Sequence, residues 1–350
     1  MSEAAQSPIL SVCMPTYNRG GWLADRVREW LDVPAPGLEI VVSDNASTDG
    51  TADALAAISD PRLVLVRNES NVGAFENQLR ALEAAHGRYV MQLMDKDELV
   101  PGGIAGALAA IEKVDVACGE FVLNSDGGSL EPVRVRSGFG AFRRHGLAFT
   151  HPSGHFFAAS ALREFGLLDR LRALDPVVRP YSTDYLVSLV LGHGGYAVVD
   201  MPFVRMNLPP YDGVAASTSY RDPSDYYFTP QFLVREFAAY VVFLERELRM
   251  PVLRRLRIVA RLAGGPLFSQ MTVWYRWRLE SDAMCAWYGM RPEFRESELR
   301  RDLTRDCAAA VRGLAGVGWL TRLAARLGVA RRLRSRSAYE IPKNIRGGKR

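Results

Sequence analysis

The chain has 350 residues, of which 48% are hydrophobic and 24% are charged, and its formal net charge is +5. This composition is typical of a globular protein with one large domain or two ordinary ones, and it excludes a disordered chain. The cysteines Cys13, Cys118, Cys285 and Cys307 are scattered without a CxxC pair. We therefore expect neither a disulfide framework nor a zinc site.

The first residues lack the basic and apolar regions of a signal peptide. No run approaches the roughly 20 apolar residues that a membrane span requires. The sequence therefore predicts a cytoplasmic protein, and it leaves open a peripheral position on the inner face of a membrane.

Short apolar runs alternate with helical patterns in the first 124 residues. Strands are expected at 9–14, 38–42, 63–66, 89–94 and 114–123. Apolar residues recur at helical spacing between them, and Gly87 is expected to end the third helix as its C′ residue. This alternation is typical of a parallel sheet covered by helices.

Polar clusters follow the first four strands, at 16–19, 44–45, 68–71 and 95–97. Ligands of open α/β sheets bind at the carboxyl ends of the strands, so these clusters predict one cleft. Neither a GxGxxG nor a GxxxxGK[ST] motif is present, which disfavours a dinucleotide-binding fold and a P-loop.

Asp95 and Asp97 end the fourth strand with one residue between them. Their like charges repel unless something positive lies between them. A hard divalent cation that carries a phosphate would fill that gap. The alternative is an acidic turn that caps the next helix.

Four segments together resemble the family 2 glycosyltransferases. They are residues 11–19 (SVCMPTYNR), 42–51 (VSDNASTDGT), 71–77 (NVGAFEN) and 87–97 (GRYVMQLMDKD). The second segment is most similar to the branch with abequosyltransferase-like enzymes of bacterial surface polysaccharides. The resemblance implies a GT-A fold over 1–230, with a nucleotide-sugar half at 1–124 and an acceptor half at 125–230. A basic, mainly helical region at 231–350 would follow.

The resemblance also assigns residues to the donor site. It implies nucleotide-sugar binding by Pro15, Thr16, Tyr17, Arg19, Asp44, Asn45, Ser47, Asn71, Gly73, Asn77, Asp95, Lys96, Asp97 and Arg205. Asp95 and Asp97 match the DxD motif, which holds Mg²⁺ or Mn²⁺ on the donor diphosphate. Lys96 departs from the usual pattern, and it would either pair with a phosphate or weaken metal binding. The alternative for Asp44 and Asn45 is a turn with Asx hydrogen bonds.

Asp184 is the candidate general base, because the resemblance places a helix-start acid at this point of the chain. Inverting transfer needs a carboxylate that takes the proton of the acceptor hydroxyl. Helix capping is the structural alternative for this residue, and Glu98 and Asp169 are competing candidates for the base. His151 and His155 are expected to bond to nearby backbone.

Residues 198–205 resemble a short strand that returns towards the cleft. Many family members carry Tyr-Arg-x-His here, whereas this chain has Val204, Arg205, Met206 and Asn207, so the His is absent. Arg205 would meet a phosphate or stay solvated. Residues 213–219 are small and polar, and they could order over the bound donor.

The C-terminal third is helical and rich in arginine, with Trp, Tyr and Leu among the arginines. Such helices suit an anionic membrane surface. A packed helical appendage or a homo-oligomer contact explains them equally well, and no nucleic-acid module is recognised.

The leading hypothesis is a metal-dependent, inverting glycosyltransferase. Its donor would be a UDP-, GDP- or dTDP-linked sugar, and its acceptor a saccharide that can be lipid-linked, in surface-glycan or natural-product biosynthesis. The alternatives are a catalytically degenerate glycosyltransferase-like binding protein and a sugar nucleotidyltransferase. The latter needs a glycine-rich signature with Arg and Lys, which is absent after the first strand.

Overall fold

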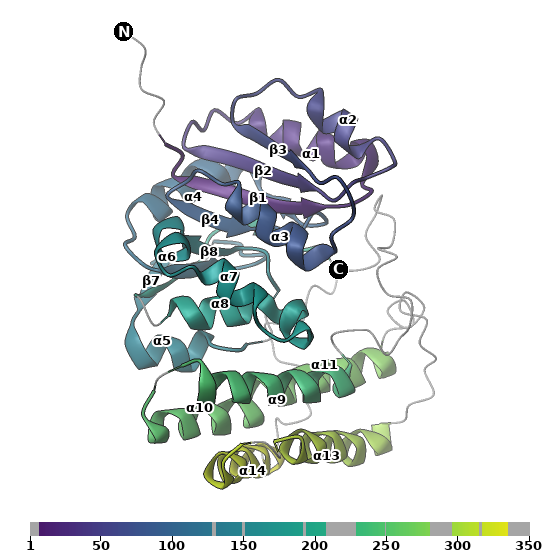
Figure 1. Cartoon of the computed structure of the whole chain (residues 1–350), viewed down its shortest axis with the longest axis vertical. Helices are drawn as coiled ribbons and strands as arrows, with labels where there is room; N and C mark the ends of the chain where they lie inside the picture. Colours follow the sequence, from purple (N-terminus) through teal and green to yellow (C-terminus); the bar gives the residue numbers. More distant parts are fainter. Residues whose placement is uncertain are drawn as a thin grey trace. The chain divides into compact units, whose positions relative to one another are not determined.

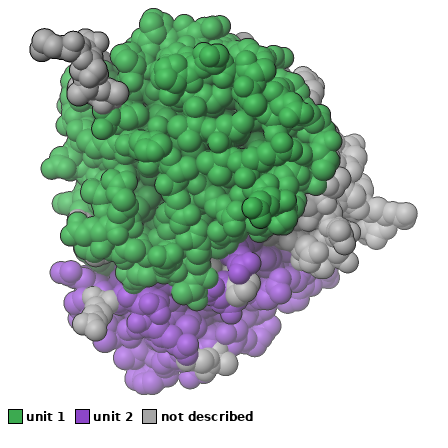
Figure 2. Space-filling model, turned by 45° about the horizontal axis from the view of Figure 1, so that its top comes forward, with its two compact units in different colours: residues 1–142, 151–173, 186–215 green, residues 143–150, 174–185, 216–350 purple. Residues whose placement is uncertain are grey.

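The structure is a computed structural model that describes residues 7–127, 131–148, 151–191, 194–207, 229–248, 250–280, 296–314 and 317–334. The chain divides into two compact units, drawn in separate colours in Figure 2. Unit 1 comprises residues 1–142, 151–173 and 186–215, and unit 2 comprises residues 143–150, 174–185 and 216–350. The predicted loop at 213–219 lies outside the described residues.

Unit 1 is built on an eight-stranded sheet (Figure 1) with the strand order β3-β2-β1-β4-β8-β6-β9-β7. The strands are β1 (Leu10–Thr16), β2 (Leu38–Asp44), β3 (Leu63–Arg67), β4 (Tyr89–Gln92), β6 (Cys118–Phe121), β7 (Val133–Arg136), β8 (His155–Ala158) and β9 (Tyr196–Val199). The four strands β1 to β4 pair in parallel, as the sequence predicts. β8 is antiparallel to both β4 and β6, so the sheet is mixed beyond β4.

Helices cover the sheet because alternate strand residues face opposite sides. Leu10, Val12 and Met14 of β1 pack in one apolar core with α1 (Gly20–Leu31) and α4 (Ile104–Glu112). α3 (Ala74–Glu83) packs against β1, β2 and β4. The other helices that lie wholly in this unit are α2 (Thr51–Ala56), α6 (Ala159–Glu164) and α7 (Leu167–Arg172), with the 3-10 turn η1 (Pro101–Gly103).

A second, two-stranded sheet follows the DxD segment. β5 (Glu98–Leu99) pairs antiparallel with β10 (Val204–Arg205). The predicted strand at 198–205 is therefore two strands, since β9 belongs to the large sheet and β10 to the small one. This pairing brings the residues after β10 to the DxD segment.

Unit 2 is helical in its described part. It contains η2 (Pro176–Tyr181), α9 (Pro230–Arg246), α10 (Val252–Gly264), α11 (Pro266–Glu280), α13 (Glu296–Arg312) and α14 (Trp319–Leu333). Two helices continue across the boundary between the units, namely α5 (Gly138–His145) and α8 (Ser182–Val190). The described helices include none that is long and apolar enough to span a bilayer.

Candidate active site

The carboxyl ends of β1, β2 and β3 lie side by side. Thr16 is the register partner of Asp44, and Asp44 is the register partner of Arg67. The Asn45 amide then donates to the Thr16 carbonyl at 2.9 Å, so the alignment continues past the strand ends. The predicted meeting of these polar clusters at one edge of the sheet is confirmed.

Two buried oxygens at this edge have no hydrogen-bond partner among the described residues. They are Oγ1 of Thr16 and Oδ1 of Asp44. The other carboxylate oxygen of Asp44 accepts from the Ser47 amide at 3.2 Å and lies 3.7 Å from Nε of Arg67. Because buried polar atoms are almost always paired, neighbouring unpaired oxygens indicate a place for a hydroxyl or amide of a ligand. Pro15 precedes them in the buried strand.

The turn after β1 is locked to the turn after β2. Asn18 has a φ of 53°, and its amide donates to Oγ of Ser47 at 2.9 Å. The Thr48 amide returns a bond to Oδ1 of Asn18, also at 2.9 Å. Tyr17, which lies between Thr16 and Asn18, is exposed at this edge.

An amide network supports the same edge from β3 and α3. Asn45 donates to Asn71 at 2.9 Å, and Asn68 donates to Asn77 at 2.8 Å. The buried Asn77 also donates to the Ser43 carbonyl at 2.9 Å. Gly73 has a φ of 84° before α3, a conformation that favours glycine. Asn77 is thus engaged from both ends of its amide within the protein, which fits a supporting role better than donor contact.

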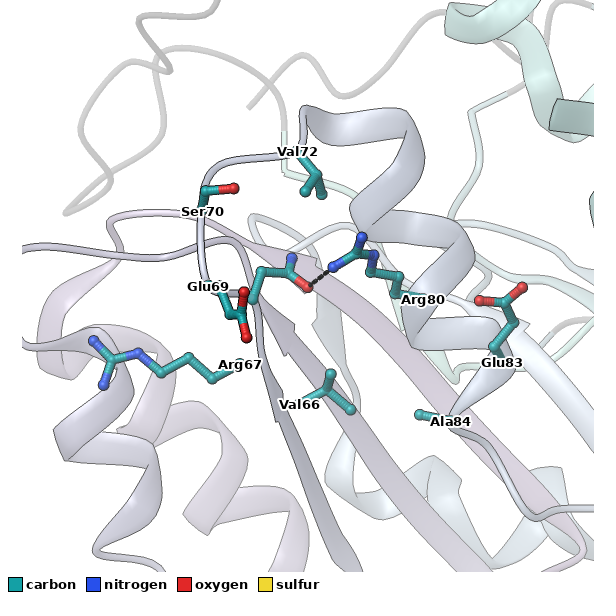
Figure 3. Close-up of a pocket in the computed structure, with 9 residues that line it drawn as sticks. Val66, Arg67, Glu69, Ser70, Val72, Arg80, Glu83 and Ala84 are labelled. Atoms are coloured by element: carbon teal, nitrogen blue, oxygen red, sulfur yellow. Dashed lines mark hydrogen bonds between the residues drawn. The ribbon is translucent and has the colours of Figure 1, made fainter.

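A polar pocket of about 590 Å³ lies next to this network, between the end of β3 and α3. Figure 3 shows Arg67 and Glu69 on the strand side and Arg80 on the helix, where Arg80 donates to Asn68 at 2.8 Å. Its lining includes neither Asp44 nor the DxD carboxylates. The pocket adjoins the strand-end cluster through Asn68 and is separate from its carboxylates.

Among the described residues, the cationic side chain that holds Asp95 is that of Arg19. Nε of Arg19 donates to Oδ2 at 2.9 Å and Nη2 donates to Oδ1 at 3.0 Å, which is the bidentate geometry of a strong pair. Arg19 stands at the start of α1, where its amide donates to Oγ1 of Thr51 at 2.8 Å. The positive group beside Asp95 is thus supplied by the first polar cluster.

Asp97 is fully buried and is bonded on all sides. It accepts from Nζ of Lys96 at 2.7 Å, Oγ of Ser153 at 2.5 Å and the Asn207 amide at 3.0 Å. Nε2 of His151 lies 3.0 Å from its second oxygen. Burial by itself raises the pKa of the Asp97 carboxyl, but His151 and Lys96 outweigh it and lower that pKa to about 2.

A divalent cation fits Asp95 better than Asp97. Both carboxylate oxygens of Asp97 already accept hydrogen bonds. Nζ of Lys96 donates to Asp97 and to the Asn207 carbonyl at 3.0 Å. If a cation displaced the side chain of Arg19, the two carboxylate oxygens of Asp95 could bind that cation. In the part of the chain that the structure describes, no group of three His, Cys, Asp or Glu is arranged around a metal position. Magnesium sites with one or two carboxylates take their other ligands from substrate phosphates and water.

Asn207 stands two residues after Arg205, at the place where the resemblance expects a histidine. Its side chain donates to the Lys96 carbonyl at 2.7 Å. Arg205 pairs with Glu98 at 3.7 Å across the small sheet, and its side chain is mostly exposed. The chain therefore fastens the DxD segment at this position with an amide, and Arg205 is solvated in this structure.

Sequence reasoning missed His151, Ser153 and Asn207 as partners of Asp97. The run His151-Pro152-Ser153-Gly154-His155 contains two of these side chains, but the sequence alone favours bonds to nearby backbone for both histidines. His155, in contrast to His151, lies in β8 and makes no bond to the DxD segment among the described residues. Burial lowers the pKa of its imidazole to about 4.

The candidate base Asp184 lies in unit 2, in the first turn of α8 as predicted. The carboxylate is buried, and its Oδ1 accepts from the Ala148 amide at 2.8 Å. Of the competing acids, Asp169 is exposed beside Arg172, whereas Glu98 lies between Arg26 and Arg205.

A second buried acid accompanies Asp184 in unit 2. Glu236 of α9 is fully buried, and burial together with the charges of Asp184 and Asp175 raises its pKa to about 8. The signal in the sequence is an acid on the apolar stripe of α9, between Leu233 and Tyr240. Glu236 is therefore mostly protonated at neutral pH.

We expect Glu236 to make the protein less stable as pH rises from about 4.5 to about 8. The folded carboxyl keeps its proton in this window while the unfolded one releases it, so stability falls by up to about 1.4 kcal/mol per pH unit. Glu236→Gln should flatten the dependence of the melting temperature on pH across the window. The exposed Glu247→Gln is the matched control and should follow the wild type. A Glu236→Gln profile parallel to the wild type would contradict the assignment.

The fold and its site define a GT-A domain: a mostly parallel sheet with a strand-end cluster that presents a DxD motif. Residues 11–171 match the family model "Glycosyl transferase family 2". The chain therefore carries a family 2 glycosyltransferase domain, and the resemblance inferred from the four motifs is confirmed.

Two curated relatives come from bacterial polysaccharide biosynthesis. The putative teichuronic acid biosynthesis glycosyltransferase TuaG of Bacillus subtilis is 40% identical over 93 residues, 26% of this chain and 36% of that protein. The abequosyltransferase RfbV of Salmonella typhimurium is 31% identical over 102 residues, 28% of this chain and 31% of that protein. The matched region thus spans about a third of the length of each relative.

A solved structure extends the similarity of fold to nearly the whole chain. Residues 1–349 of TarS from S. aureus, in complex with UDP-GlcNAc, superpose with a TM-score of 0.58 at 15% identity. The alignment covers 94% of this chain and 89% of that one. At this identity the comparison supports the fold, including its helical C-terminal region.

Proposed function

We propose that the protein transfers a sugar from a nucleotide-sugar donor to a saccharide acceptor with inversion at the anomeric carbon, in bacterial surface-glycan biosynthesis. One observation carries this: the unpaired Thr16 and Asp44 oxygens share an edge with the Arg19–Asp95 pair. The first two suit a base or ribose, and the pair suits a diphosphate with its counter-charge. The complex of TarS with UDP-GlcNAc supports this class of donor.

In the proposed reaction Asp184 takes the proton of the acceptor hydroxyl as that oxygen attacks the anomeric carbon. The bond to the nucleoside diphosphate breaks on the opposite side, and Asp184 leaves the step protonated. Glu236, already protonated, does not compete for that proton.

We propose Asp95 as the protein ligand of Mg²⁺ or Mn²⁺, with the donor phosphates completing its coordination. The cation would neutralise charge on the leaving nucleotide. Asp97, Lys96 and Asn207 hold the segment that carries Asp95, and Arg19, once displaced, is a cation within reach of the same phosphates.

A degenerate binding protein is the second candidate, favoured by the engagement of Lys96 with Asp97 and by Asn207 in place of His. A screen of UDP-, GDP- and dTDP-sugars with Mg²⁺ or Mn²⁺, read out as release of the nucleotide, separates the two. We expect turnover of one donor class, faster with a saccharide acceptor. Binding of a nucleotide with no release from any sugar would favour the degenerate form.

The acceptor and the location are part of the proposal. We infer a cytoplasmic enzyme whose acceptor is a lipid-linked saccharide, because the C-terminal helices combine arginines with exposed apolar residues. A lipid-linked acceptor would bring the enzyme to a membrane surface.

A further inference from the structure

Helix α14 buries small side chains and exposes large apolar ones. The residues that it buries are small, namely Thr321, Ala324, Ala325 and Gly328, with Val329 the largest. Its large apolar residues face solvent instead: Trp319 is 66% exposed, Leu320 40%, Leu323 43% and Leu327 61%. Since burial of large apolar side chains stabilises a fold, a helix normally buries its large apolar residues and exposes its small or polar ones.

The small residues allow a close approach of α14 to α10. A Cβ on Gly328 would lie 2.0 Å from the Ala260 carbonyl oxygen, and one on Gly264 would lie 2.4 Å from that of Gly328. Only glycine fits such a contact. The small residues of α14 thus pack against α10. The opposite face of α14, which carries the large apolar residues, has no packing partner in the described part of the chain.

The exposed residues of α14 form one stripe. Positions 319, 320, 323 and 327 are spaced so that they share a face of the helix. Val252 and Leu253, in the first turn of α10, are 48% and 71% exposed. Together these six residues are most of the exposed large apolar side chains in the described ranges.

The two helices run in the same direction, which brings their first turns to the same end. Oγ1 of Thr321 donates to Oε1 of Glu245 at 2.7 Å, and Nη2 of Arg255 lies 3.6 Å from the same oxygen. Further along, Gly328 meets Ala260 and Gly264. Val252 and Leu253 therefore lie at the same end of the helix pair as Trp319 and Leu320, and we call the six exposed apolar residues of these two helices the apolar face.

The apolar face is surrounded by positive charge. Neither α10 nor α14 contains an Asp or Glu, whereas each carries four arginines. Arg254, Arg257, Arg326 and Arg331 are exposed. Trp and Leu flanked by Arg are the composition of helices that lie in the interface of an anionic bilayer. Each cation near such a surface strengthens binding to it.

Charge also decides between the candidate occupants. Residues 335–350 carry Arg336, Lys343, Arg346, Lys349 and Arg350 against Glu340, so this segment would be repelled by the arginines of α10 and α14. A second copy of the chain would bring the same arginines to the contact. A nucleic acid would match the charge but not the Trp and Leu side chains.

We propose that the apolar face docks on the anionic phospholipid surface of a bilayer, with α14 lying in the plane of the head groups. Trp319 and Leu323 enter the boundary with the acyl chains, while Arg326 and Arg331 contact the phosphates. This deepens the proposed function, because it would place the enzyme where a lipid-linked acceptor resides. Vesicle binding needs neither donor nor acceptor, so its failure is distinguishable from a failure of the proposed activity.

The test is co-sedimentation of the full chain with vesicles of phosphatidylglycerol and phosphatidylcholine in equal parts, and with phosphatidylcholine alone. We expect binding to the mixed vesicles and roughly tenfold weaker binding to the neutral ones. The double variant Trp319→Ser, Leu323→Ser should lose binding by roughly tenfold or more. Because Trp319 and Leu323 are exposed, we expect the double variant to melt at the same temperature as the wild type. Val135→Ser, exposed to a similar degree in unit 1, is the matched control and should bind as the wild type.

Three results would overturn the proposal. The first is a wild type that stays in the supernatant with the mixed vesicles. The second is a double variant that binds them as well as Val135→Ser. The third is a wild type that is dimeric in sedimentation velocity and a double variant that is monomeric, since the face would then belong to a second copy. Weaker binding of the variant Arg326→Glu, Arg331→Glu, together with a smaller effect of added salt on its binding than on that of the wild type, would support the phosphate contacts.

Discussion

The Asp184→Asn variant is expected to lose sugar transfer by a factor of about 10²–10⁴ while it binds the donor as tightly as the wild type. An amide cannot take the proton of the acceptor hydroxyl, so the loss falls on the chemical step. The side-chain oxygen of Asn can still accept from the Ala148 amide, which keeps the start of α8 in place. Single-turnover rates and donor titrations on the same preparations measure the two effects separately.

Two controls make this result specific to Asp184. Glu98→Gln and Asp169→Asn remove the competing acids, and both should retain transfer within a few-fold of the wild type. Full activity in Asp184→Asn, or a loss confined to Glu98→Gln, would remove Asp184 from the role of base.

The two aspartates of the DxD motif are expected to differ sharply when each is changed to Asn. Asp97→Asn should lower the free energy of unfolding by about 3–5 kcal/mol, because it removes the fully buried carboxylate that pairs with the half-buried Lys96. Asp95→Asn should cost less stability and should abolish the effect of Mn²⁺ on donor binding. Urea unfolding and donor titrations with and without Mn²⁺ test the pair, in which each variant is the control for the other.

The free energy of unfolding at acidic pH gives an independent check on the role of Asp97. Its folded pKa of about 2 lies below the unfolded value, so its contribution is present above pH 4 and is lost as pH falls towards 2. Asp97→Asn should therefore weaken the loss of stability in this window. Retention of Mn²⁺-dependent donor binding by Asp95→Asn, with its loss in Asp97→Asn, would reverse the assignment.

The donor half of the fold was predictable because its signals are local. Each of the first four strands is an apolar run that stops at a polar cluster, and parallel pairing then brings Thr16, Asp44 and Arg67 into line. The order of the motifs sufficed to identify the family. The strand pairing confirms the shared edge of the sheet, whereas the donor-binding roles of Asp44, Arg19 and Asp95 stay predictions.

The rest depended on contacts between distant segments. β8 enters the sheet antiparallel between β4 and β6, and this insertion carries His151 and Ser153 to Asp97. Gly87 was expected as a helix C′ residue, but α3 ends at Glu83. The glycine is needed instead where the chain passes close to β1, since a Cβ there would lie 2.6 Å from Oγ and 2.8 Å from the backbone nitrogen of Ser11.

The division of the chain also differs from a simple order of domains. The predicted boundary at residue 230 stays a prediction, and the compact units are interleaved in sequence, with 143–150 and 174–185 in unit 2. Glu236 shows why such features could not be predicted from the sequence. Its raised pKa results from burial and from the charge of Asp184, and both depend on the folded structure.

The most direct test of the central claim is a titration of the protein with UDP, GDP and dTDP, with and without Mn²⁺, followed by calorimetry and by the melting temperature. We expect one nucleotide to bind and to raise the melting temperature, more strongly with Mn²⁺. Asp44→Asn should weaken that binding by roughly tenfold, and the exposed Asp53→Asn should not. A protein whose melting and heats are unchanged by every nucleotide and by Mn²⁺ would contradict the assignment of this strand-end cluster to a nucleotide sugar.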